Sequence, residues 1–262
     1  ATTFNSAFKG CYHLASIPSH LFDNCPLVDS FNGTFQNCSK ITSLPAALLS
    51  NNPEVITYTL MFAGCKIDKI PTDLLGKACS TATNFSDMFS GNVNSELPEG
   101  LFKYAVSATN YSGVFYNCKA TTIPNDLFAG NNATWSNAFT LDRITAIGNN
   151  SLVGLNITSN MLKNKTVLKT VGNDTFWQKD REEITNAPTE LLSGCTGLTS
   201  IGNINLKPVS ADTDLNSMFL NCSSLTDVSG FFYGENNEPS LAQNISFESS
   251  PLTYTSLTNI KN

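Results

Sequence analysis

Apolar and polar residues recur along this chain with a period of 26–27 residues in its first half. The recurring pattern is F-x-x-C-x-x-L-x-x-I-P, and Phe35, Cys38, Ile41, Leu44 and Pro45 form one clear copy. The proline closes five copies, at residues 18, 45, 71, 98 and 124. A fixed period of this length is typical of a protein built from stacked structural repeats.

Later copies replace the proline with glycine. Ile147-Gly148, Val171-Gly172 and Ile201-Gly202 then take the place of Ile-Pro. The apolar residue that opens each copy falls at positions 8, 35, 62, 89, 115, 139, 162, 192, 219 and 247. We therefore predict ten units of 23–30 residues that form a single repeat domain over residues 1–262.

Each unit combines two kinds of predicted element. The C-x-x-L-x-x-I segment predicts a short strand that pairs in parallel with its neighbours, and the proline ends the strand because it has no N–H to donate. Two short pieces with apolar residues three to four apart, LF and F-x-x-x-F, predict helical or 3-10 turns on the opposite side. The residue before the cysteine position is Gly or Asn in eight of ten copies, which predicts a left-handed backbone there.

These columns, together with L-T-S-I-G at residues 198–202, resemble the BspA-like leucine-rich repeat family and surface proteins built on MF-x-x-C-x-x-L. The resemblance covers essentially the whole chain. It implies an α/β repeat fold: a right-handed leucine-rich-repeat solenoid of about ten coils, with a parallel β-sheet on one face and short helical or 3-10 turns on the other. It also implies cell-surface display and adhesion, commonly in Bacteroidetes-type bacteria. Similar repeats occur in phage tail-fibre-like proteins.

Composition narrows the classes of partner. A net charge of −6 and a pI of about 4.9 argue against nucleic acid, which needs clustered Lys and Arg. No stretch approaches the ~20 apolar residues of a membrane span. The chain begins without Met and ends without a change of composition, so we expect a fragment whose signal or anchor lies outside it. We expect it to be monomeric.

The eight cysteines do not predict a disulfide framework. Six share one repeat column, at 11, 38, 65, 118, 195 and 222, and Cys25 and Cys79 share another. Stacked side chains point the same way, which disfavours a bond between neighbouring rungs. No Cys/His spacing suggests zinc, and we expect no metal and no cofactor. We predict buried thiols. A disulfide, a reactive thiol, or a Cys–His pair such as Cys25/His20 or Cys11/His13 are the alternatives.

Two candidate binding surfaces follow from the pattern. The first is a hydroxyl-rich strip between the apolar strand positions, formed by Thr42, Ser43, Asp68, Lys69, Thr122, Thr199, Ser200, Thr226 and Asp227. The second is the long connection over residues 174–190, which carries Trp177 and Arg181. Either surface can also be simply a solvated strip or loop.

The function that this pattern favours is a non-catalytic, extracellular adhesion module that recognises a host or surface protein or a glycan through an extended face. The alternatives are a structural spacer or a phage tail-fibre-like receptor-binding segment. An enzyme whose residues gather across several repeats is the least favoured.

Overall fold

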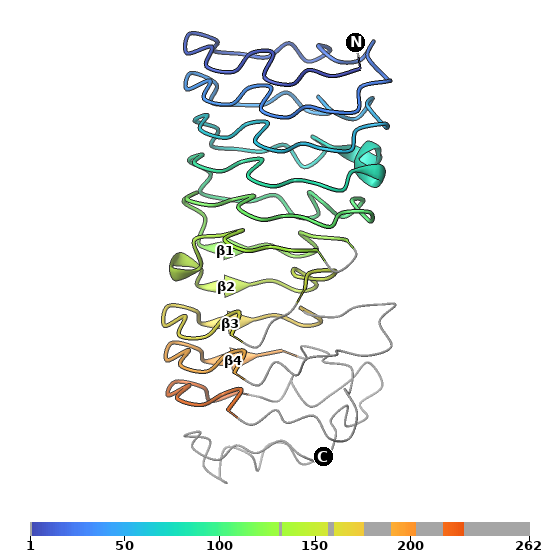
Figure 1. The fold of residues 1–262 in the computed structure, drawn as a ribbon. Helices are drawn as coiled ribbons and strands as arrows, with labels where there is room; N and C mark the ends of the chain where they lie inside the picture. The colour runs from blue at the N-terminus through green and yellow to red at the C-terminus, as the bar shows by residue number, and fades with distance from the viewer. Residues whose placement is uncertain (1, 131–132, 157–159, 176–189, 203–216, 228–262) are drawn as a thin grey trace. The chain divides into compact units, whose positions relative to one another are not determined.

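The computed structural model describes residues 2–130, 133–156, 160–175, 190–202 and 217–227 (Figure 1). The chain divides into two compact units. The first consists of Ala1–Thr140 with Gly154–Asn156, and the second of Leu141–Val153 with Ile157–Asn262. The expectation of a single domain over residues 1–262 stays a prediction.

Regular elements are short in the described ranges. They comprise two 3-10 helices, η1 (Gly76–Thr81) and η2 (Leu141–Arg143), and four strands, β1 (Thr122–Ile123), β2 (Ala146–Ile147), β3 (Thr170–Val171) and β4 (Ser200–Ile201). Strands β2, β3 and β4 are parallel and lie in chain order, with Ile147 opposite Val171 and Val171 opposite Ile201. Parallel pairing with few helices is consistent with the predicted α/β class.

The strands end where the sequence predicts. β1 stops at Ile123, directly before Pro124, and β3 and β4 stop directly before Gly172 and Gly202. The change from proline to glycine has a physical reason. The Gly172 amide donates to the Ile147 carbonyl at 2.8 Å, and the Gly202 amide donates to the Val171 carbonyl at 2.8 Å. Proline could make neither bond because it has no N–H.

A second set of parallel pairs in the first unit corrects the prediction of helical turns around F-x-x-x-F. Equivalent residues of six successive copies pair there, namely Thr3, Ser30, Thr57, Asn84, Asn110 and Thr134. In the turns that follow, amides alternate between two kinds of acceptor. The Phe8 amide donates to Thr34 in the next copy, whereas the Lys9 amide donates to Ser6 within its own turn.

Left-handed residues are the reason that these turns do not become helices. Ser6, Leu60 and Asp87 have φ of 55°, 56° and 54° three residues after the pairing position. A helix requires negative φ at every residue, so each of these positions interrupts it.

The predicted left-handed position before the cysteine column is confirmed. All eight Gly and Asn residues described there have φ between 59° and 73°: Gly10, Asn37, Gly64, Gly91, Asn117, Asn164, Gly194 and Asn221. Leu141 occupies the same slot, and the 3-10 helix η2 begins there instead.

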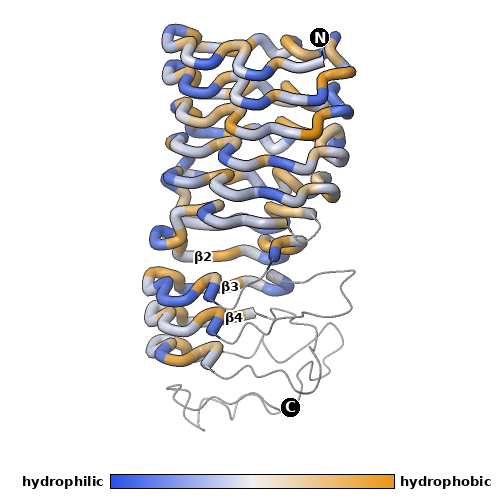
Figure 2. Tube along the Cα trace, viewed as in Figure 1, coloured by the Kyte–Doolittle hydropathy of each residue, from blue (hydrophilic) through white to orange (hydrophobic). Residues whose placement is uncertain are grey.

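Two columns of stacked aromatic rings form the core of the first unit. Phe8, Phe35 and Phe62 begin one column, with ring centroids 5.2 and 5.7 Å apart. The column continues through Phe89, Phe115 and Phe139. The second column consists of Phe4, Phe31, Tyr58, Phe85 and Tyr111. Figure 2 shows hydrophobic and hydrophilic stretches alternating along the chain in this unit.

Candidate functional site

In the first unit, the predicted hydroxyl-rich strip brings residues of neighbouring copies together. Ser43 pairs in parallel with Lys69, and the Asp68 amide donates to the Thr42 carbonyl at 3.2 Å. All four side chains are exposed, as is Thr122 in strand β1. The Asp68 carboxylate accepts a hydrogen bond from the Ser95 hydroxyl at 3.3 Å.

In the second unit, the predicted strip residues lie in or next to strand β4 and in the copy that follows it. Ser200 pairs in parallel with Asp227, and the Thr226 amide donates to the Thr199 carbonyl at 3.1 Å. Thr199, Thr226 and Asp227 are exposed and Ser200 is half-buried. The other predicted contact residues, Trp177 and Arg181, lie outside the described residues.

Sequence reasoning missed a second polar surface, which we call the polar ladder. It has two columns that run through six copies of the first unit. One column contains Thr3, Ser30, Thr57, Asn84, Asn110 and Thr134, and the other contains Asn5, Asn32, Thr59, Ser86, Ser112 and Ser136. Every member is exposed or half-buried, and none is charged.

The polar ladder arises from ordinary strand alternation. Between its two columns lies one aromatic residue per copy, and Phe31, Tyr58, Phe85 and Tyr111 are fully buried there. Side chains two residues apart on an extended segment point the same way, so burying the aromatic turns both of its neighbours outward. The signal was therefore readable in the sequence as Ser, Thr or Asn on both sides of an aromatic.

Hydrogen bonds fix the polar ladder's side chains. The Thr134 hydroxyl donates to Asn110 Oδ1 at 3.0 Å, and the Ser112 amide donates to the same oxygen at 2.9 Å. The Thr59 and Ser86 hydroxyls, from neighbouring copies, lie 3.3 Å apart. The surface therefore presents hydroxyl and amide groups in fixed positions, one pair per copy.

The thiols are mostly buried, as predicted, and no disulfide joins any of the eight cysteines, all of which lie in the described residues. Cys38 donates to the Phe8 carbonyl of the preceding copy at 3.0 Å, and Cys65 donates to Phe35 at 3.2 Å. Asn92 stands at the cysteine position of the fourth copy and donates to the Phe62 carbonyl at 2.8 Å. At this position of the repeat, a thiol or an Asn amide therefore donates a hydrogen bond to a backbone carbonyl of the preceding copy.

Burial also sets the chemistry of the thiols. It raises the pKa of Cys65 and Cys222 to about 12 and that of Cys195 to about 11. The prediction of burial is wrong for two cysteines, since Cys11 is exposed and Cys25 is half-buried. Cys11 belongs to the first copy, where no preceding copy among the described residues covers the column.

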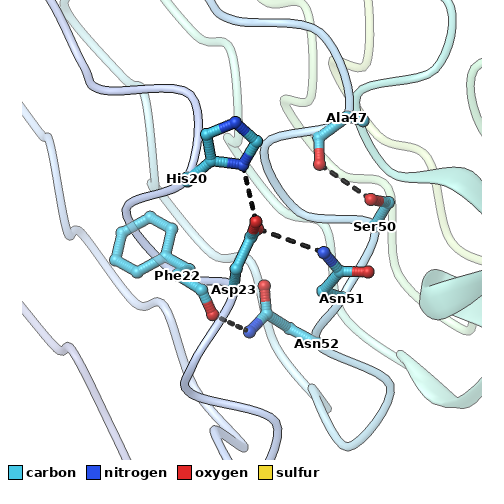
Figure 3. Close-up of polar contacts among 7 residues, drawn as sticks. All are labelled: His20, Phe22, Asp23, Ala47, Ser50, Asn51 and Asn52. Carbon is cyan, nitrogen blue, oxygen red and sulfur yellow. Dashed lines mark hydrogen bonds and ion pairs between the residues drawn. The ribbon is translucent and has the colours of Figure 1, made fainter.

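The sequence left a Cys25–His20 pair as an alternative. In the structure, the His20 ring contacts Asp23 instead. His20 Nδ1 lies 2.7 Å from Asp23 Oδ2, and Asn51 donates to Asp23 Oδ1 at 3.1 Å (Figure 3). These two hydrogen bonds, that of His20 first, lower the pKa of Asp23. Asn52 anchors the adjoining turn by donating to the Phe22 carbonyl at 3.1 Å.

The described residues contain no group of three or more His, Cys, Asp or Glu placed to hold a metal ion. Within the same ranges, no helix is both long and apolar enough to cross a membrane. Comparison with known proteins found no family model that matches this chain and no matching curated protein.

Proposed function

We propose that this chain is a non-catalytic binding module, displayed outside the cell, that adheres to a surface protein or glycan through an extended repeat face. The fold that goes with this proposal is a right-handed solenoid of about ten coils of the BspA-like leucine-rich-repeat type. Its support is the repeat pattern of the sequence and the parallel pairing of successive copies.

The polar ladder is the observation that carries the proposal. Each hydroxyl can donate and accept a hydrogen bond, and each Asn amide offers both roles on separate atoms. Twelve such side chains over six copies offer an uncharged surface to a ligand that extends along several copies. Contacts spread in this way suit a glycan chain or a flat protein surface better than a small molecule, for which a concave pocket is typical.

The chemistry of the buried thiols supports binding over catalysis. A thiol reacts as its thiolate, and burial holds the pKa of Cys38, Cys65, Cys79, Cys195 and Cys222 above the ordinary value. His20, one of the two candidate histidines, is engaged with Asp23. We therefore place the function on the outer hydroxyl and amide groups.

Binding of the purified protein to arrays of glycans and extracellular-matrix proteins tests the proposal. We expect a retained ligand, and we expect the double variant Ser86→Lys, Ser112→Lys to lose at least tenfold in affinity, because two bulky cations would interrupt the uncharged columns. Ser19→Lys, on an exposed position elsewhere in the first unit, is the matched control and should bind normally.

The double variant Asp68→Ala, Lys69→Ala tests the predicted hydroxyl-rich strip in the same assay. If only this variant loses affinity, the strip and not the polar ladder is the binding face. If the wild-type protein binds nothing on either array, an adhesion function is contradicted and the structural spacer is favoured. Binding to intact bacterial cells, with both arrays silent, would favour the phage tail-fibre-like alternative.

A further inference from the structure

One face of the first unit carries an excess of positive charge. It is formed by the C-x-x-L-x-x-I segments of copies two to five, over residues 38–44, 65–70, 92–97 and 118–123. This face holds four of the seven lysines of residues 1–140 but only two of the nine acidic residues. The lysines are Lys40, Lys66, Lys69 and Lys119, and the acids are Asp68 and Glu96. Exposed charges more than ~10 Å apart are largely screened at 0.1 M salt, so the local excess and not the net charge of the chain decides which ligands this face attracts.

Three of these lysines stand at one repeat position, which we call the lysine row: Lys40, Lys66 and Lys119. All three are exposed. The residues that directly follow them, Ile41, Ile67 and Ala120, are buried at 0%, 0% and 3% exposure. Neighbouring side chains on an extended segment point to opposite sides, so burial of the following residue turns each lysine outward.

Backbone hydrogen bonds place the copies that carry the lysine row side by side. The Lys66 amide donates to the Ile41 carbonyl at 3.0 Å, the Val93 amide to the Ile67 carbonyl at 3.2 Å, and the Lys119 amide to the Asn94 carbonyl at 2.9 Å. Paired strands lie ~4.8 Å apart, so Lys66 is about one such step from Lys40 and about two from Lys119. Val93 takes the row position in the copy between them and is uncharged.

The charges of the lysine row are not neutralised within the described residues. None of the three lysines forms an ion pair with a described carboxylate. The acid of this face that follows Lys66, Asp68, accepts a hydrogen bond from the Ser95 hydroxyl at 3.3 Å. Exposed hydroxyls of Thr42, Ser43 and Ser95 lie further along the same segments and can each donate and accept a hydrogen bond. The face therefore combines spaced cations with hydroxyl groups.

We propose that the lysine row and the hydroxyls beside it bind a polyanionic glycan whose sulfate or carboxylate groups contact successive lysines. A lysine carries a compact charge on a flexible stem, so the row can follow anions that are not spaced like the copies. A single glycan chain is narrow enough to lie along the row. A nucleic-acid duplex is wider and would bring phosphates over Asp68 and Glu96.

The proposed site lies on a different segment of each copy from the polar ladder. It therefore goes beyond the proposed function, which rests on the uncharged polar ladder, and it adds a ligand class that the polar ladder does not select. Either surface can fail its own test without the other.

Binding of the purified full chain to heparin, a highly sulfated glycan, tests the lysine row. Affinity measured over a range of salt concentrations should fall as salt rises, because bound lysines displace counterions from the polyanion. We expect the double variant Lys40→Gln, Lys66→Gln to bind at least tenfold more weakly than wild type in low salt. Its slope of log affinity against log salt should be shallower by about one for each lysine removed.

The matched control is the double variant Lys77→Gln, Lys103→Gln, which removes the same charge from the same unit. These lysines lie over the Tyr104 ring, at 5.9 and 5.0 Å from its centroid, and not on the lysine row. We expect the control to bind heparin as the wild type does. Equal losses in the two double variants would show that net charge alone sets the affinity and would overturn the proposal.

Two further outcomes would also overturn the proposal. One is a wild-type protein that does not bind heparin in low salt. The other is an affinity for duplex DNA that equals or exceeds the affinity for heparin, since the face would then not select a glycan. Both results leave the polar ladder to its own variants, Ser86→Lys with Ser112→Lys, on the uncharged ligands of the arrays.

Discussion

At the scale of single residues, two glycines share a left-handed backbone conformation but differ in how closely neighbouring atoms approach them. Gly91 and Gly154 have φ of 73° and 78°, so alanine is strained at both. A Cβ on Gly91 would meet no atom closer than 3.8 Å, whereas one on Gly154 would lie 2.6 Å from the Gly130 carbonyl oxygen. We expect Gly154→Ala to lower the free energy of unfolding by about 1–3 kcal/mol more than Gly91→Ala. Urea titration measures both, and equal losses would contradict the close approach.

The contact of His20 with Asp23 makes a second prediction at the same scale. In His20→Ala, the pKa of Asp23 should rise toward its ordinary value, because the largest contribution to its lowering is lost. Asn51→Ala should raise it less, since that hydrogen bond contributes less. A lowered folded-state pKa gives stability that is present above the unfolded pKa and is lost as pH falls through the folded one. Carboxyl NMR titration of the three proteins checks the order, and an Asp23 pKa unchanged in His20→Ala would contradict it.

At the scale of elements, each ring of an aromatic column supports the copies on both sides. Phe62 is fully buried and stacks at 5.7 Å on Phe35 and on Phe89. We expect Phe62→Ala to destabilise the protein by about 3–5 kcal/mol. Hydrogen exchange should then rise at the Phe35 and Phe89 amides as well, because neighbouring copies stabilise each other. Tyr12→Ala, at a side chain 62% exposed, is the control and should stay within about 0.5 kcal/mol of wild type. Faster exchange confined to one copy would contradict the coupling.

The same elements show which structural features could be predicted from the sequence and which could not. The buried columns, the strand ends and the left-handed Gly/Asn position were all predicted, because each depends on a residue type that has one strong physical preference. The turns around F-x-x-x-F were not, because a spacing of four apolar residues also fits a helix. The deciding left-handed position carries Ser6, Leu60 and Asp87 as readily as glycine, so no residue type marks it. The polar ladder was missed for the same reason, since the predicted strand was placed on the C-x-x-L-x-x-I segment and not on the residues around the aromatic.

At the scale of the whole molecule, burial of thiols in both units makes stability depend on alkaline pH. Burial raises the pKa of Cys65, Cys79 and Cys222 to about 12 and that of Cys195 to about 11, from an ordinary value of 9.0. Below pH 9 the folded and unfolded states both keep these protons, so the thiols cause no change. Above pH 9 the unfolded chain releases them first, and the free energy of unfolding falls as pH rises toward 11–12.

Because Lys and Tyr also titrate in this range, the test of the thiols is a comparison of variants. Urea unfolding at pH 8.0, 9.5 and 10.5 should show a steeper fall for the wild type than for Cys65→Ala and for Cys222→Ala, which lie in different units. Each variant starts less stable at pH 8.0, since it loses a buried thiol and its bond to the preceding copy. The diagnostic quantity is therefore the slope with pH and not the stability itself. Parallel slopes for all three proteins would mean that thiol burial does not control alkaline unfolding. A shallower slope in only one variant would confine the effect to the unit that contains it.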